Sequence, residues 1–389
     1  MPIPSSRTLK IAALCSAYFP LSHADVIVSR WLCPRPTDAK WGWPACDGPR
    51  SEIASFYVAQ FPSDDTSREV ATRFEVPMFA SIRDALTLGT SALAVDGVLL
   101  IVEHGDFPLN SRRQKLYPRF EWFQQIVEVF QDTGRVCPVW IDKALSWNPE
   151  QARQIVEIAR EMKIPLMAGS SLPHAGFSPP FNWQNENLEE VVALFYGGPE
   201  IYGFHSLELV HSLMQRCGGV QPVSSVEVLC GEEVWQAMDK GQWSRELFDN
   251  ALGATRQQES GDVRYNCQPN PDLEAVLSQA HRRGGMTATT AELSPVSALA
   301  WKVKRTAGTR EVYVMLAGHL GTHCVAARSE SGKVWAGEIN SSGAQEFHPH
   351  FAIQNRAVEE FFVSGTPSIP LENALQSSVA IAAFMEALA

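Results

Sequence analysis

The sequence of 389 residues contains neither a long apolar run nor a run of basic residues. A membrane-spanning helix needs about 20 successive apolar residues, and the apolar run at 11–15 is also too short for the core of a signal peptide. The net charge of −11 repels nucleic-acid phosphates and anionic lipids. We therefore expect a cytoplasmic protein whose partner is a small molecule, and neither nucleic acid nor a membrane.

The eight cysteines include no Cys-x-x-Cys pair, which is the spacing typical of structural zinc sites. A chain of this length can fold without disulfides, so we expect free thiols in a reducing compartment. Hydrophobic residues make up 45% of the chain and charged residues 19%, which is a globular composition. The length predicts two domains.

Strand-like and helix-like segments alternate through residues 1–171. The expected strands, most of them apolar runs, are 9–15, 53–60, 77–79, 96–102, 138–141 and 166–169. The expected helices between them are 23–32, 64–74, 81–88, 119–133 and 149–162. This alternation predicts an α/β domain with a Rossmann-like, doubly wound parallel sheet.

The pattern changes in residues 172–389, which we expect to form a second domain. The expected strands follow one another with few helices between the later ones, at 191–196, 223–229, 299–306, 311–317 and 323–328. Helices are expected at 204–216, 232–239, 244–252, 270–282 and 371–388. The pattern predicts an α+β domain with an open mixed or antiparallel sheet, and a terminal helix that can pack back on the first domain.

Four segments match, in order and in place, the pattern of a known protein family. They are Asp96–Glu103 (DGVLLIVE), Asp142–Leu145 (DKAL), Gly203–Leu213 (GFHSLELVHSL) and Phe361–Leu388 with its Gly-x-Pro turn before a terminal helix. The chain thereby resembles the Gfo/Idh/MocA family, the glucose-fructose oxidoreductase and inositol dehydrogenase-like proteins, over nearly its whole length. The resemblance implies the two-domain fold, a nicotinamide-dependent oxidoreductase, and a homodimer or homotetramer.

The turn that should hold the pyrophosphate of the cofactor contains no glycine. In the family the first strand leads into Gly-x-Gly-x-x-Gly, which lets the backbone approach a pyrophosphate at a helix N-terminus. Here residues 15–24 read CSAYFPLSHA, and the second strand ends in Gln60 where an acidic residue should bind the ribose. The resemblance therefore implies a divergent member of the family, in which NAD(P) would bind by an altered loop. The expected cofactor-binding residues are Ser16, Tyr18, Ser22, His23 and Gln60.

Two residues carry the catalytic roles that the resemblance implies. Lys143 follows the carboxyl end of a strand, where α/β sheets bind ligands, and the matching family lysine binds the substrate hydroxyl. His205 matches the catalytic histidine and, as a neutral imidazole, could accept the hydroxyl proton. Asp142 completes the expected catalytic set. The structural alternatives are a surface lysine paired with Asp142 and a hydrogen-bonded core histidine.

Glu103 and His104 end a strand at a position that faces the nicotinamide in the family. A glutamate and a histidine suit an acid–base pair or a metal better than a hydride site. With His205 and Glu208 they would form a Zn, Mn or Fe site, because a histidine and a carboxylate at i, i+3 can converge on one ion. Alternatively, Glu208 orients His205, or the strand-end pair is merely solvated. The expected substrate contacts are Glu103, His104, Tyr117, Trp147, Ser170 and Tyr202.

Three functions follow, in order of preference. The first is an NAD(P)-dependent oxidoreductase acting on a sugar, a polyol or a related hydroxy compound, with His205 as the acid–base group and Lys143 on the substrate oxygen. The second is a nicotinamide-independent lyase, isomerase or hydrolase that uses a metal or acid–base groups on the same fold. The third is a non-catalytic binding protein.

Overall fold

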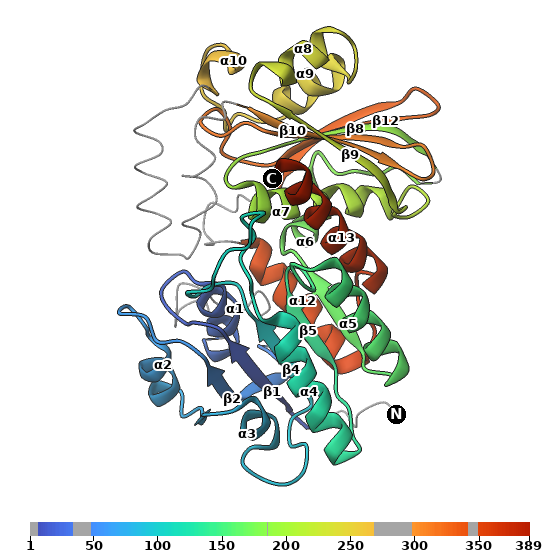
Figure 1. The fold of residues 1–389 in the computed structure, drawn as a ribbon. Helices are drawn as coiled ribbons and strands as arrows, with labels where there is room; N and C mark the ends of the chain where they lie inside the picture. The colour runs from blue at the N-terminus through green and yellow to red at the C-terminus, as the bar shows by residue number, and fades with distance from the viewer. Residues whose placement is uncertain (1–6, 34–47, 185, 268–297, 341–348) are drawn as a thin grey trace. The chain divides into compact units, whose positions relative to one another are not determined.

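The structure is a computed structural model that describes residues 7–33, 48–184, 186–267, 298–340 and 349–389 (Figure 1). The chain divides into two compact units, and neither is a single stretch of sequence. Unit 1 comprises residues 1–108, 116–174 and 341–375, and unit 2 comprises residues 109–115, 175–340 and 376–389. Two stretches belong to the second unit although the residues next to them in sequence belong to the first. One is the short segment 109–115, whose ends Leu109 and Lys115 form an antiparallel bridge, and the other is the end of the last helix.

The sheet of unit 1 has six parallel strands in the order β3-β2-β1-β4-β5-β6. They are β1 Leu9–Cys15, β2 Ser51–Val58, β3 Met78–Phe79, β4 Gly97–Ile101, β5 Val139–Asp142 and β6 Leu166–Gly169. The strand order reverses between β1 and β4, so the crevice for ligands in this fold opens above these two strands. The prediction of a Rossmann-like parallel sheet is confirmed.

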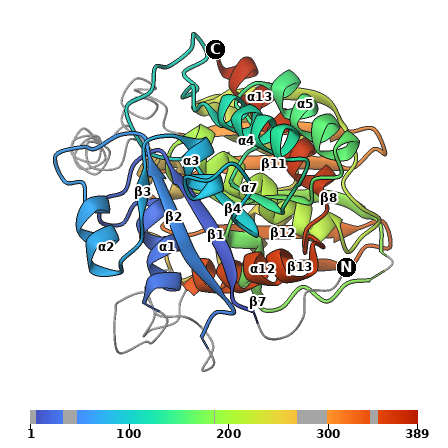
Figure 2. The same ribbon diagram turned by 90° about the horizontal axis from the view of Figure 1, so that it is seen from below.

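Helices cover both faces of this sheet, which explains why its central strands are apolar throughout. The helices are α1 His23–Leu32, α2 Ser67–Arg73, α3 Ile82–Thr87, α4 Arg119–Thr133, α5 Pro149–Glu161, α6 Leu172–Ala175 and α12 Pro349–Ser364. Apolar residues of α3, α4 and α5 form the core on one face, and those of α1, α2 and α12 form the core on the other (Figure 2). Helix α12 was not expected from the sequence, and it completes the second face beside α1.

The sheet of unit 2 has seven strands in the order β7-β13-β12-β8-β11-β10-β9. They are β7 Phe177–Ser178, β8 Leu188–Phe195, β9 Val223–Cys230, β10 Leu299–Arg305, β11 Arg310–Met315, β12 Cys324–Ser329 and β13 Val334–Ile339. Strands β8 and β11 run parallel, and the other neighbours run antiparallel. The prediction of a mixed sheet is confirmed, although β7 and β13 were not foreseen.

The remaining helices are α7 Pro199–Met214, α8 Glu232–Asp239, α9 Arg245–Gly253, α10 Val263–Asn266 and α13 Leu371–Leu388. Helix α7 begins five residues earlier than expected, because Pro199 supplies the fixed φ angle that suits a first helical turn. The helix expected at 270–282 lies outside the described residues. Within the described part of the chain, no helix has the length and hydropathy that a membrane crossing requires. The seven cysteines described there are free thiols, as expected.

A buried chain of polar groups joins the sheet of unit 2 to its helices. Arg305 on β10 donates to Glu311 at 2.5 Å, and both side chains are fully buried. The same guanidinium lies 2.8 Å from Nε2 of His211, whose Nδ1 lies 2.8 Å from the Ser377 hydroxyl on α13. Since the guanidinium can only donate, Nε2 accepts, and Nδ1 carries the proton that His211 donates to Ser377.

Glu208 ends this chain of hydrogen bonds, because the Ser377 hydroxyl donates to its carboxylate. The Glu208 side chain is buried in unit 2, and α7 is attached to α13 through this contact. Burial and the neighbouring Arg305 hold the pKa of His211 well below its usual range, so the imidazole is neutral. Glu208 is therefore a structural residue of the unit 2 core.

Replacing Arg305 with methionine should lower the free energy of unfolding by about 3–5 kcal/mol, because Glu311 would be left charged, buried and unpaired. The measurement is a urea titration followed by circular dichroism. Arg245→Met is the matched control, since the Arg245–Asp239 pair is exposed and such pairs contribute less than about 1 kcal/mol. Equal losses in the two variants would show that the buried chain does not stabilise unit 2.

Candidate functional site

The ends of β4 and β5 bring four chemically active side chains together in unit 1. Glu103 and His104 follow β4, whereas Asp142 ends β5 and Lys143 follows it. The two strands are neighbours in the sheet, with Leu100 opposite Ile141. The carboxyl edge of a parallel sheet at its switch point is where this kind of fold binds ligands.

Glu103 is held between two cations in the interior. Its carboxylate accepts from Lys143 Nζ at 2.7 Å and from Arg119 Nη2 at 2.6 Å, and the side chains are only 4–6% exposed. Burial by itself would raise the pKa of Glu103, but Lys143, Arg119 and His23 outweigh it and hold the pKa below the usual value. The alternative in which Lys143 is a surface residue paired with Asp142 is therefore wrong.

The backbone at Lys143 has a left-handed conformation, with φ at 65°. This conformation costs a non-glycine residue about 1–2 kcal/mol, so the surrounding structure must enforce it. The amide of Lys143 donates to the carbonyl of Gly169 at 3.2 Å, which ties the turn to the end of β6. The strained backbone directs the side chain to Glu103 at the edge of the sheet.

His23, the first residue of α1, contacts Asp142 and His104, the other two side chains at the ends of β4 and β5. Its Nδ1 lies 2.6 Å from Asp142 Oδ2, and its ring centroid lies 5.2 Å from that of His104. Burial raises the pKa of Asp142 to about 6, although Lys143 and Arg119 act to lower it. When Asp142 is ionised, its carboxylate can only accept a hydrogen bond, so Nδ1 of His23 carries a proton and donates it to this bond.

The amides at the N-terminus of α1 are bonded within the chain. The amide of His23 donates to His104 Nδ1 at 3.3 Å, and those of Phe19 and Asp25 donate to Ser22 Oγ at 3.2 Å. The carboxylate of Asp25 in the same turn accepts from the amide of Leu21 at 2.9 Å. A pyrophosphate would need these amides as donors and would meet a carboxylate beside them.

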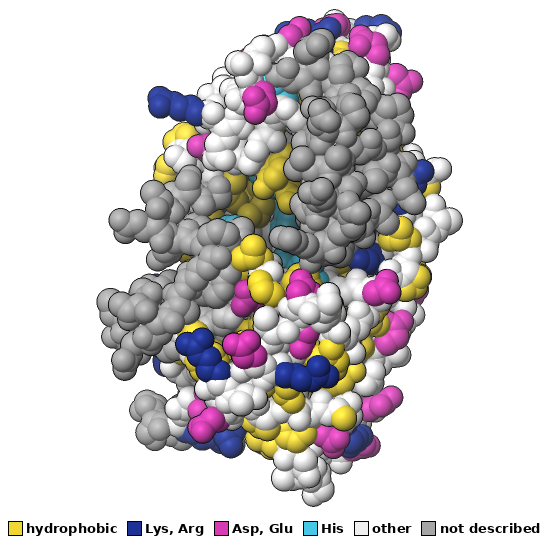
Figure 3. Space-filling view, turned by 90° about the vertical axis from the view of Figure 1, so that its left-hand side faces the viewer, with side chains coloured by type: hydrophobic (Ala, Val, Ile, Leu, Met, Phe, Trp, Pro, Cys, Tyr) yellow, Lys and Arg dark blue, Asp and Glu magenta, His cyan; other side chains and the backbone are white. Residues whose placement is uncertain are grey.

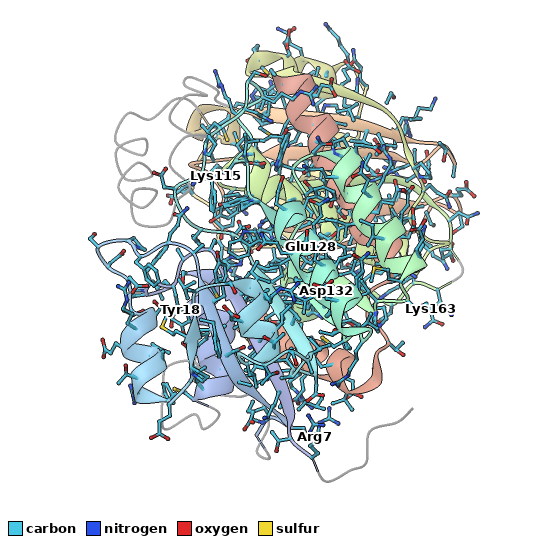
Figure 4. The ribbon with its side chains drawn as sticks, turned by 60° about the horizontal axis from the view of Figure 1, so that its bottom comes forward. Arg7, Tyr18, Lys115, Glu128, Asp132 and Lys163 are labelled. Atoms are coloured by element: carbon cyan, nitrogen blue, oxygen red, sulfur yellow. The ribbon has the colours of Figure 1, made fainter. Side chains whose placement is uncertain are left out.

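The other residues expected to bind the cofactor also face their own chain. Tyr18, labelled in Figure 4, is buried in the core and its hydroxyl lies 2.9 Å from Ser29 Oγ on α1. Ser16 bonds to the backbone of Ile101. Gln60 makes two hydrogen bonds to the backbone of Asp106, at 2.7 and 3.1 Å. The described residues at the end of β1 therefore do not fit the phosphates of a dinucleotide.

The expected substrate contacts of unit 1 lie around the same strand ends. Tyr117 is buried, with the Arg119 guanidinium 4.7 Å from its ring centroid, and Trp147 is half-buried after β5. Ser170 Oγ accepts from the amide of Leu172 at 3.1 Å. The contact between Arg119 and Glu103 could not be predicted from local pattern, because the two residues come from different elements. Its position at the first turn of α4 was the one available signal.

In unit 2, His205 lies on α7 within a cluster of aromatic rings. Its centroid lies 6.1 Å from that of Tyr202 and 6.2 Å from that of His323. His323 contacts the Ser206 hydroxyl at 3.0 Å, and burial lowers its pKa to about 3, so it is neutral. Glu208 is bonded to Ser377 in the unit 2 core. Among the described residues, no group of three or more His, Cys, Asp or Glu side chains is placed to hold a metal.

No protein-family model and no curated protein matches the sequence. Solved structures share its fold. They include scyllo-inositol dehydrogenase from Lactobacillus casei with NAD(H) and scyllo-inositol bound (TM-score 0.55, 11% identity, 98% of this chain and 97% of that one). Myo-inositol 2-dehydrogenase from Lactobacillus plantarum is similar (0.55, 9%, 98% of each). UDP-N-acetylglucosamine 3-dehydrogenase from Acidithiobacillus ferrooxidans is another (0.53, 9%, 98% and 97%). At these identities the likeness shows the two-domain fold.

The raised pKa of Asp142 predicts how stability depends on pH. The folded protein keeps this proton up to about pH 6, whereas the unfolded chain loses it near 3.8, so the free energy of unfolding falls as the pH rises between these values. The full loss is about 3 kcal/mol, and Asp142→Asn should lack it. Urea titrations of both proteins at pH 4.5, 5.5 and 7 measure the difference. A constant difference between the two proteins would contradict the assignment.

Proposed function

We propose that the chain is an enzyme that acts on a sugar, a polyol or a related hydroxy compound by proton transfer without net redox change, as in an isomerisation or an elimination. The observation that carries this proposal is the buried Lys143–Glu103–Arg119 group at the carboxyl edge of the unit 1 sheet. The substrate class is supported by the fold, since the similar structures include inositol and sugar-nucleotide dehydrogenases.

Lys143 is the proposed ligand of the substrate oxygen. Its ammonium has three N–H donors, one of which goes to Glu103, and a further donor can stabilise negative charge that develops on an oxygen. Because the pKa of Glu103 is held low, this carboxylate keeps its charge and does not remove the proton of the ammonium. Arg119 contributes by positioning Glu103 and does not need to contact the substrate.

The second candidate is an NAD(P)-dependent oxidoreductase of the same substrate class. It is supported by the similarity to a dehydrogenase that was solved with NAD(H). The bonded amides of α1 count against it, and for that reason we assign no step to a nicotinamide. In this candidate His205 is the acid–base group, which is the role that the resemblance implies for it.

We also propose a small molecule as the partner and self-association into a dimer or tetramer, as in the family that the chain resembles. Light scattering coupled to gel filtration tests the second point. On the face drawn in Figure 3, acidic and basic side chains of the described residues are interspersed, without an extended basic area. This distribution, with the net charge of −11, supports the expectation that nucleic acid is not a partner.

Lys143→Met should reduce turnover at least 100-fold, because the substrate oxygen would lose its charged donor. The assay is incubation with a panel that includes inositols, sugars and nucleotide sugars in D₂O, followed by proton NMR for C–H exchange and new products. Lys163→Met is the matched control, because Lys163 also has a positive φ of 55° but is exposed at the end of α5 (Figure 4). Unchanged turnover in Lys143→Met would overturn the proposal.

His205→Gln separates the two candidates. If the chain is an NAD(P)-dependent oxidoreductase with His205 as its acid–base group, the variant should lose at least 100-fold in the kcat measured with added NAD⁺ or NADP⁺. If the chain works without a nicotinamide, the variant should keep its turnover in the exchange assay. The readouts are nicotinamide absorbance and the same NMR assay. Turnover at the wild-type rate would remove His205 from the catalytic set.

A further inference from the structure

The N-terminus of α1 carries a carboxylate–imidazole pair made by Asp142 and His23. The two side chains are 2% and 14% exposed, and the distance from Nδ1 to Oδ2 is 2.6 Å. The edge of the Phe351 ring meets the imidazole with centroids 5.1 Å apart, so the ring is held by packing as well as by the hydrogen bond. Such a pair, with one imidazole nitrogen on a carboxylate, orients the other nitrogen for proton transfer.

His104 fixes the position of the pair from the other strand. Its Nδ1 accepts the backbone amide of His23, and its ring packs against Phe19 with centroids 5.3 Å apart. A neutral imidazole that accepts at Nδ1 carries its proton on Nε2. The first backbone donor of α1, the amide of His23, is thus bonded to His104 of the same unit. The imidazole of His23 is hydrogen-bonded to the carboxylate of Asp142 on β5.

Gln60 closes the crevice above β1. It stands after β2 and is bonded at both ends of its amide to Asp106, which follows β4, and β1 lies between these two strands in the sheet. Gly105 permits this approach, since a Cβ there would lie 2.8 Å from Gln60 Oε1, and its φ of 120° suits only glycine. The bridge crosses the end of the strand above which a dinucleotide lies in this kind of fold.

We propose that His23, oriented by Asp142, is the general base and acid of the reaction, and that this edge of unit 1 does not hold a nicotinamide dinucleotide. The inference rests on the proposed function. Nε2 of His23 removes a proton from a hydroxyl or from a carbon next to a carbonyl. The electron pair of the broken bond stays with the substrate, and its charge rests on an oxygen that Lys143 can stabilise. The imidazolium then returns the proton to the substrate, so the step is balanced without an oxidant.

Charge on the surrounding groups supports this exchange of a proton. Lys143, Arg119 and His23 all lower the pKa of Glu103. The His23–Asp142 pair therefore interacts electrostatically with the Lys143–Glu103–Arg119 group. Within the described part of the chain, Asp142 on β5 is hydrogen-bonded to His23, and Glu103 after β4 interacts with it electrostatically. An imidazolium formed at His23 is therefore stabilised by two carboxylates at the moment when the substrate carries the negative charge.

The first experiment needs no substrate. Calorimetric titration of the whole protein with NAD⁺, NADH, NADP⁺ and NADPH should give no binding below about 1 mM, and ¹⁵N NMR of labelled histidines at pH 8 should show His23 with its proton on Nδ1. In Asp142→Asn the Nδ1 signature should change. Micromolar binding of any dinucleotide, or a His23 proton on Nε2 in the wild type, would overturn the inference.

The second experiment uses the exchange assay. His23→Gln should lose at least 100-fold in kcat with little change in KM, and it should lose the fall of kcat at low pH that protonation of a general base causes. Asp142→Glu should recover part of the kcat that Asp142→Ala loses. His174→Gln is the control for a unit 1 histidine outside the pair. Full activity in His23→Gln, with Lys143→Met inactive, would sink this inference and leave the proposed function standing. Full activity in both would remove the proposed function itself.

Discussion

The arrangement of the site depends on one desolvated carboxylate. Glu103 lies at the end of β4 with its charge buried, which is tolerable only when cations and hydrogen bonds compensate. Lys143 and Arg119 supply this compensation from β5 and α4, so that a turn after one strand is fixed to its neighbour and to a helix. The left-handed backbone at Lys143 is tied to the end of β6 by its amide, which donates to the Gly169 carbonyl. The position of the lysine side chain is thus tied to the buried carboxylate of Glu103.

The residues on the other side of the strand ends form a second group with different chemistry. At the two strand ends, His104 follows Glu103 and Asp142 precedes Lys143. Asp142 and His104 are the two residues that contact His23. One group is the pair of ion pairs that Glu103 makes, in which its pKa is held below the usual value, while the other contains two imidazoles and a carboxyl whose pKa is raised to about 6. A fixed electrostatic element beside a group that can titrate is the division of roles that acid–base catalysis requires.

The sequence predicted what depends on local pattern. The apolar runs at β1 and β4 and the bounds of α4 are confirmed, because buried strands and amphipathic helices are written in short periodicities. The pairing of His23 with Asp142 spans 119 positions and could not be read from either segment. Glu208 is the converse case: its spacing from His205 suggested a shared ligand, whereas in the structure its buried carboxylate accepts from Ser377 of α13.

Fold and cofactor site are determined by different parts of the chain, so a likeness in fold to dehydrogenase structures does not by itself carry their dinucleotide site over to this chain. The strand order of the sheet follows from the burial of whole strands. The fold is therefore shared with solved structures in which only about a tenth of the residues are identical to those of this chain. Phosphate binding depends on a few amides at one helix end and on open space above β1. In this chain His104 and Ser22 take those amides, and Gln60 crosses that space. The fold can therefore persist while the chemistry at its switch point changes, and we propose that in this chain it has changed from phosphate binding to proton transfer.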